Sequence, residues 1–178
     1  MKNNSQNEAG FRQLLEDQLK DIYWAEKAIV KAMPEVVEKV DSQELVDELT
    51  EHMELTIQQV LRLENVFEIL DMKAQAEKCA AMEGLIEEAE DILDELDKGP
   101  VRDAGIIAAV QKIEHYEIAT YGSLRAFANL LGEYEAAYLL GETLEEEKEA
   151  DIKLTDLAES VINIEAAAGE ERSNYRDE

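Results

Sequence analysis

The sequence predicts an all-α protein built as a four-helix bundle, with one crossover connection that carries a short extra helix. Residues with high helix propensity dominate the chain, and only two prolines and eight glycines occur in its 178 residues. Apolar residues recur at helical spacing along four long segments, which is the pattern of helices that bury one face. The length suits one domain, so we expect a single bundle over residues 1–168.

The first two long helices are expected over about residues 9–40 and 43–72. The apolar stripe of the first begins at Phe11 and passes through Leu15, Ile22 and Ile29 at four- and seven-residue steps. Asp41 and Ser42 follow it and are suitable N-caps for the second helix. The two helices therefore form a hairpin with a short turn.

A polar stretch over residues 73–78 leads to a shorter helix at about 82–96, which we assign to the crossover connection. Gly99 and Pro100 then precede a third long helix that ends near residue 131, and Gly132 is suited to a left-handed C-terminal cap. The fourth long helix is expected over about residues 134–164. A charged tail over 169–178, short of large apolar groups, is predicted to be disordered.

Two long hairpins joined by one crossover define the ferritin-like plan of the four-helix bundle.

The net charge of the chain excludes several classes of partner. Forty-three acidic and seventeen basic residues give a formal net charge of −26, which repels nucleic acids and anionic membrane surfaces. A well-solvated surface is sufficient to explain this charge, although the charge also attracts cations.

The cysteine content and the N-terminus bear on the cellular location. The single cysteine, Cys79, cannot form an internal disulfide, and the polar N-terminus does not look like a secretion signal. We expect a cytoplasmic protein.

A few acidic residues fall inside the apolar stripes when each helix is drawn at about 100° per residue. They are Glu26 on the first long helix, Glu114 and Glu117 on the third, and Glu147 and Asp151 on the fourth. Burying a carboxylate is costly unless it is paired, neutralised or bound to a metal ion. Several buried acids at one depth therefore call for a common explanation.

The depths of these acids agree when the helices are folded back about their turns. Glu117 reflected about Gly132 lies level with Glu147, and Glu26 reflected about the first turn lies level with Thr56. Oxygen-rich ligands of this kind suit a dinuclear iron or manganese site. The candidate metal ligands are Glu26, His52, Glu114, Glu117, Glu147 and Asp151.

Each of these residues also has a purely structural interpretation. A single buried glutamate can pair with a lysine or stay protonated, and a lone histidine beside an apolar stripe, such as His52, is more often a packing residue. Glu54 and His115 point away from the stripes and are assigned to the surface. The shared depth of the acids favours the metal site over these alternatives.

Four segments of the chain resemble the YciF-like bacterial stress proteins, a ferritin-like family. They are residues 23–27 (YWAEK), 79–88 (CAAMEGLIEE), 112–122 (KIEHYEIATYG) and 142–158 (ETLEEEKEADIKLTDLA), and the similarity extends over about residues 10–165. The resemblance implies a bundle similar to rubrerythrin, a homodimer, a role in stress responses and a two-metal centre. Glu114 and Glu117 match the Glu-x-x-Glu motif that rubrerythrin-type sites carry on the third long helix.

Two positions depart from the usual ligand pattern of such sites. Ile57 and Ala150 stand three residues after Glu54 and Glu147, where that pattern has histidine.

Two hypotheses about function follow from these observations. The first is an oxidoreductase or metal-handling protein that acts on dioxygen or peroxide, with Glu117 and Glu147 as bridging ligands and the other acids as terminal ones. The second is a non-catalytic structural or assembly protein that keeps the bundle without a working site. A storage shell is disfavoured, because no segment identifies a cage interface.

Overall fold

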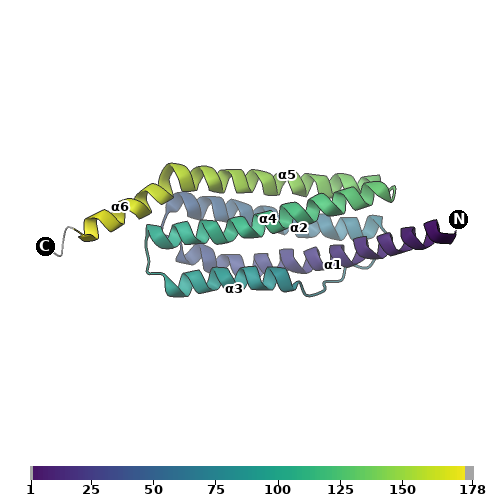
Figure 1. The fold of residues 1–178 in the computed structure, drawn as a ribbon, viewed down its shortest axis with the longest axis horizontal. Coiled ribbons are helices and arrows are strands. Elements are labelled where there is room, and N and C mark those ends of the chain that lie inside the picture. Colours follow the sequence, from purple (N-terminus) through teal and green to yellow (C-terminus); the bar gives the residue numbers. More distant parts are fainter. Residues whose placement is uncertain (1, 175–178) are drawn as a thin grey trace.

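A computed structural model describes residues 2–174, and every element assigned within this range is helical. This confirms the predicted fold class. The elements, labelled in Figure 1 where there is room, are α1 (Lys2–Lys39), α2 (Gln43–Ile69), α3 (Ala80–Glu95), α4 (Pro100–Leu130), α5 (Tyr134–Leu157), a π-helical turn η1 (Ala158–Ile162) and α6 (Asn163–Asn174).

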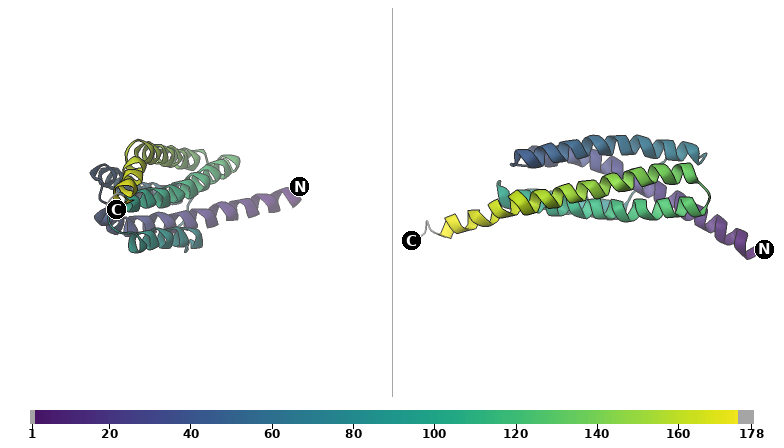
Figure 2. Two further views of the ribbon diagram at one scale, coloured as in Figure 1. Left: turned by 60° about the vertical axis from the view of Figure 1, so that its left-hand side comes forward. Right: turned by 90° about the horizontal axis from the view of Figure 1, so that it is seen from above.

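The four long helices α1, α2, α4 and α5 form the bundle. Helix α1 packs on α2 and on α4, and α5 packs on α4 and on α2, so that the two hairpins lie side by side (Figures 1 and 2). The short helix α3 lies outside this set and packs on α1 and α4. It therefore covers the α1–α4 side of the bundle and leaves the α2–α5 side without a further layer.

The turn between α1 and α2 is tied to α4 by one buried carboxylate. The carboxylate of Asp103 accepts hydrogen bonds from the backbone N–H groups of Asp41 and Ser42, at 3.1 and 2.8 Å. Ser42 is the N-cap of α2, and its hydroxyl accepts from the N–H of Leu45 at 3.4 Å. Ser42 is thus confirmed as a cap, whereas the role of Asp103 has no local signature in the sequence.

Helices α2 and α4 both end in a left-handed residue. Gly132 has φ 81° after α4, and the next residue, Glu133, donates its N–H to the carbonyl of Ala128 at 2.9 Å, as in a Schellman motif. The predicted glycine cap is therefore confirmed. Asp71 takes the same place after α2 with φ 54°, a conformation that favours glycine.

The C-terminal part of the chain differs from the prediction. Instead of one helix ending near residue 164, α5 passes into η1 and then into α6, which runs past the end of the bundle as far as Asn174 (Figure 1). Residues 169–174 are thus helical rather than part of a disordered tail, because alanine and glutamate sustain a helix after the apolar stripe has ended. Residues 175–178 of the expected tail lie outside the described residues. Over residues 2–174, no helix is long and apolar enough to cross a membrane.

Candidate metal centre

Four ligand-type side chains meet in the interior of the bundle. His52 comes from α2, Glu114 and Glu117 come from α4, and Glu147 comes from α5. One ligand atom from each lies within 4.8 Å of the others. All four are buried, with exposed fractions between 0% and 4%. We call His52, Glu114, Glu117 and Glu147 the four-residue cluster.

Glu26 brings α1 into the same region. It is fully buried, and one of its carboxylate oxygens, Oε1, accepts a hydrogen bond from the hydroxyl of Tyr121. Burial raises the pKa of Glu26 well above its ordinary value, and the nearby charge of Glu147 raises it further. Carboxyl groups from three helices therefore face one another beside one imidazole.

The buried polar atoms of this region mostly lack partners within the protein. Buried polar groups in folded proteins are almost always hydrogen-bonded, so a set of orphan atoms at one place requires an explanation. His52 Nε2 is 3.2 Å from Glu114 Oε1, but the two atoms do not meet hydrogen-bond geometry. The orphan atoms of the cluster and its neighbour are Glu26 Oε2, His52 Nε2, both carboxylate oxygens of Glu114 and of Glu117, and Glu147 Oε2.

This donor set fits iron or manganese. Carboxylate oxygens and a neutral imidazole nitrogen are the ligands that these metals accept, and the described residues place no thiolate with them. The carboxylate oxygens without partners lie close together, so one cation could bind several of them at once.

The protonation of the cluster follows from burial. Burial raises the pKa of Glu114 and of Glu117 well above the ordinary value, and neighbouring carboxylates raise it further. The pKa of Glu147 rises to about 7, mainly through burial, although a hydrogen bond from Gln59 and the charge of Arg62 oppose the rise. Burial lowers the pKa of His52 to about 4. At neutral pH, the cation-free cluster therefore holds protons on carboxyl groups and keeps its imidazole neutral.

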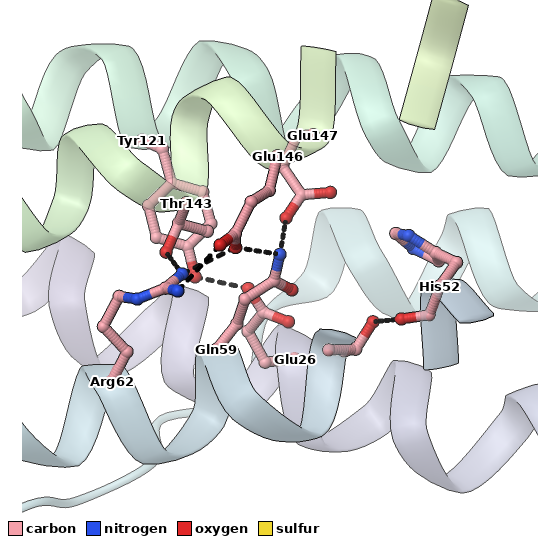
Figure 3. Close-up of polar contacts among 9 residues, drawn as sticks. Glu26, His52, Gln59, Arg62, Tyr121, Thr143, Glu146 and Glu147 are labelled. Atoms are coloured by element: carbon pink, nitrogen blue, oxygen red, sulfur yellow. Dashed lines mark hydrogen bonds and ion pairs between the residues drawn. The ribbon is translucent and has the colours of Figure 1, made fainter. Parts of the chain in front are cut away.

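A polar network holds Glu147 in place across the α2–α5 interface (Figure 3). Gln59 Nε2 donates to Glu147 Oε1 at 2.5 Å and to Glu146 Oε2 at 3.1 Å. Arg62 binds Glu146 through two nitrogens, at 2.6 and 2.7 Å, and donates to the hydroxyl of Thr143 at 2.8 Å. The orientation of Glu147 is thus set by Gln59, which is itself anchored by the Arg62–Glu146 pair.

The remaining candidate, Asp151, lies apart from the four-residue cluster. Its side chain is 20% exposed, accepts a hydrogen bond from Gln111 at 3.1 Å, and lies 3.4 Å from Nε2 of His115. His115 and Glu54 are exposed, as expected.

The structure adds Tyr121 and Arg62 to the surroundings of the site. Neither is among the residues expected from the sequence. Tyr121 stands four residues after Glu117, on the same helix face, and that spacing was the available indication of its role. Arg62 has no comparable indication.

The fold and the cluster define an all-helical bundle protein with buried carboxylates at its centre. A model of the family described as "Domain of unknown function (DUF892)" matches residues 10–167, and the chain belongs to that family.

Two known proteins show how closely members of the family resemble this chain. Protein YciF of Escherichia coli strain K12 is 47% identical over 149 residues, covering 83% of this chain and 90% of its own. The crystal structure of the E. coli stress protein YciF matches with a TM-score of 0.83 and 45% identity, over 86% of this chain and 97% of that one. YcfI of Rhodopseudomonas palustris, described with a suggested structural role, matches with a TM-score of 0.80 and 42% identity, over 82% and 92% of the two chains. The resemblance to YciF-like stress proteins is confirmed.

Proposed function

We propose that this protein is a ferritin-like stress-response protein that binds iron or manganese at a dinuclear, carboxylate-rich centre. The observation that supports the proposal most strongly is the four-residue cluster, in which ligand atoms from three helices lie within 4.8 Å of one another. Most of their buried polar atoms have no other partner in the protein. A folded chain rarely leaves so many buried groups unsatisfied at one place unless they have a ligand.

The ligands divide between two neighbouring positions. His52 and Glu114 would hold one cation, and Glu26 would hold the other from the α1 side. Glu117 and Glu147 would be shared by both cations, because Glu117 lies close enough to feel the charges of Glu26 and Glu147, and Glu147 acts on Glu26 as well. When bound, iron or manganese would supply electron exchange with dioxygen or peroxide.

Other residues prepare this arrangement. Gln59 orients Glu147 through the 2.5 Å hydrogen bond, and the Tyr121 hydroxyl holds one oxygen of Glu26. The apolar interior excludes water, which strengthens the attraction between carboxylate and cation. A cation would enter only by displacing the protons that burial keeps on the glutamates, so binding is coupled to proton release.

A second function, a structural or assembly role without metal, is favoured by the same raised pKa values. Because Glu114 and Glu117 can remain protonated and neutral, the bundle can fold without a cation. The suggested structural role of YcfI agrees with this alternative.

Manganese binding separates the two functions. The apoprotein is titrated with Mn²⁺ at pH 7.5, and the free ion is followed by its electron paramagnetic resonance signal. The proposal expects saturable binding by the native chain and weaker binding by Glu117→Gln and Glu147→Gln. Glu145→Gln, at an exposed position of α5 outside the site, is the matched control and should bind as the native chain does. Equal binding by all four proteins, or no binding at all, would contradict the metal centre, and no binding would favour the structural role.

A further inference from the structure

A small pocket opens between α2 and α5 directly beside the four-residue cluster. His52 and Ala150 line its inner part, and Glu48, Glu51, Glu149 and Lys153 line it nearer the surface. The pocket lies on the α2–α5 side of the bundle, which α3 does not cover. It therefore joins the solvent to the neighbourhood of the buried glutamates.

His52 belongs to both the pocket and the cluster. It is 4% exposed, it lines the pocket, and its Nε2 has no hydrogen-bond partner. The same imidazole lies within 4.8 Å of ligand atoms from the three glutamates of the cluster. A cation in the pocket would thus meet an unpaired nitrogen ligand before it met the carboxylates.

The outer part of the pocket carries an excess of negative charge. Glu48, Glu51 and Glu149 are opposed there by a single cation, Lys153. The Lys153 amine reaches from α5 to α2, where it lies 2.9 Å from Glu51 and 3.4 Å from Glu48. Its side chain is 40% exposed, and exposed ion pairs of this kind are weak and break readily.

The cavity on the opposite side of the bundle has none of the four-residue cluster in its lining. The cavity between α1, α3 and α4 is lined mainly by apolar side chains, including Met33, Leu93 and Val110. Its two acids, Glu35 and Glu90, are exposed, and the apolar walls beyond them offer no ligands to replace the water that a divalent cation must lose.

We propose that the α2–α5 pocket is the access route for divalent cations to the buried centre. Acids at its mouth attract the cation, His52 receives it at the inner end, and Lys153 closes the mouth through its ion pairs with Glu48 and Glu51. This inference rests on the proposed metal binding and adds the path and its closure.

The test compares rates with equilibrium binding. Mn²⁺ loading of the apoprotein is followed by stopped flow, and release of bound Mn²⁺ is followed after adding excess chelator. Lys153→Ala removes the ion pairs that close the pocket, and Lys148→Ala is its control, because Lys148 is a partly exposed lysine of α5 that pairs with Glu145. Glu149→Lys reverses a charge at the mouth, and Glu145→Lys makes the same change at an exposed position away from it.

Removing the ion pairs of Lys153 should speed both the loading and the release of Mn²⁺. Lys153→Ala should raise the rates of loading and of release roughly threefold to tenfold over Lys148→Ala, because breaking two exposed ion pairs lowers one barrier that both processes cross. If Lys153→Ala acted only by removing a positive charge from the mouth of the pocket, loading would become faster and release slower. Glu149→Lys should slow loading relative to Glu145→Lys, and the difference should shrink at high salt.

The two proposals fail in different ways. If the native protein binds Mn²⁺ but Lys153→Ala and Glu149→Lys behave as their controls do, the access route is wrong and the centre stands. If the native protein binds no Mn²⁺ at equilibrium, both are wrong. Circular dichroism of each variant establishes that it is folded.

Discussion

Gln59 on α2 and Glu147 on α5 are joined by a 2.5 Å hydrogen bond across the helix interface. The donor is an amide, so it supports the ionised carboxylate without adding a charge of its own. This hydrogen bond opposes the rise that burial causes in the pKa of Glu147, which reaches about 7. The pKa values of Glu114 and Glu117 are raised well above the ordinary value of a glutamate. Glu147 is thus the carboxyl group of the cluster that titrates near neutral pH.

Replacing Glu147 by glutamine should stabilise the apoprotein and destabilise the metal-loaded protein. At pH 8 the change removes a charge that burial disfavours, and a pKa shift of this size corresponds to on the order of 3 kcal/mol. With metal bound, the lost ligand lowers the melting temperature instead. Thermal unfolding with and without Mn²⁺ measures both effects, and Glu145→Gln should change neither. Identical effects of Glu147→Gln in the two states would eliminate the site.

The apoprotein should lose stability as pH rises from about 4.5 to 7. The pKa of Glu147 is raised on folding from 4.5 to about 7, so the folded state binds more protons than the unfolded state within this window. The contribution of Glu147 is therefore fully present below pH 4.5 and is lost as pH rises through 7. Urea unfolding at several pH values measures the slope, and Glu147→Gln should reduce it. An unchanged slope in that variant would show that Glu147 is not the titrating group.

Metal occupancy should fall between neutral and mildly acidic pH. Protons compete with the cation for the glutamates, whereas His52, with its pKa lowered to about 4, stays neutral throughout this range. His52→Ala should therefore weaken Mn²⁺ binding about equally at pH 6 and pH 8. Equilibrium dialysis at the two pH values provides the measurement. A loss confined to pH 6 would mean that His52 does not act as a neutral ligand.

Ala150→His should raise the affinity for metal. Ala150 stands three residues after Glu147, and it lines the same pocket as His52. A histidine there would supply the nitrogen ligand that the usual di-iron pattern has at this position. Mn²⁺ titration of the folded variant measures the change, and Ala136→His, a buried alanine substitution near the other end of α5, controls for the added bulk. Unchanged affinity would mean that Glu147 is not a ligand.

Asp71→Gly should stabilise the protein by about 0.5–1 kcal/mol, because glycine adopts the left-handed conformation of Asp71 without steric cost. Asp71 is exposed, so no packing is lost. Asp71→Ala is the matched control and should destabilise the protein, since alanine tolerates this conformation less well than aspartate. Urea unfolding distinguishes the two, and a destabilised Asp71→Gly would contradict the assignment of the cap.

The sequence predicts the long helices well because their apolar stripes are continuous and their ends are marked by strong local residues. Gly132 and Ser42 are such markers, and both cap the helices as expected. Asp71 takes a glycine's conformation without being glycine, so its cap had no marker. The π-helical turn at Ala158–Ile162 likewise has no marker in the sequence.

The inward direction of the acids was predictable from helical periodicity, and their common depth from the lengths of the two hairpins. Glu26, Glu114, Glu117 and Glu147 are all buried as expected. Partners across helices were not predictable, because they depend on how each helix is rotated about its axis. This is why the Gln59–Glu147 and Tyr121–Glu26 bonds emerge only from the structure.

The acids and the imidazole are divided between the two hairpins, with Glu26 and His52 on the first and Glu114, Glu117 and Glu147 on the second. Helical hairpins often open as separate cooperative units in hydrogen exchange. In the cation-free protein, the boundary between these units contains buried polar atoms without hydrogen-bond partners, so we expect it to open more readily than the interface within either hairpin. A cation bridging the boundary would reverse this and bind the halves into one unit. Hydrogen exchange of the whole backbone would then report whether metal is bound, because the cation-free protein would open one hairpin at a time and the metal-bound protein would open only as a whole.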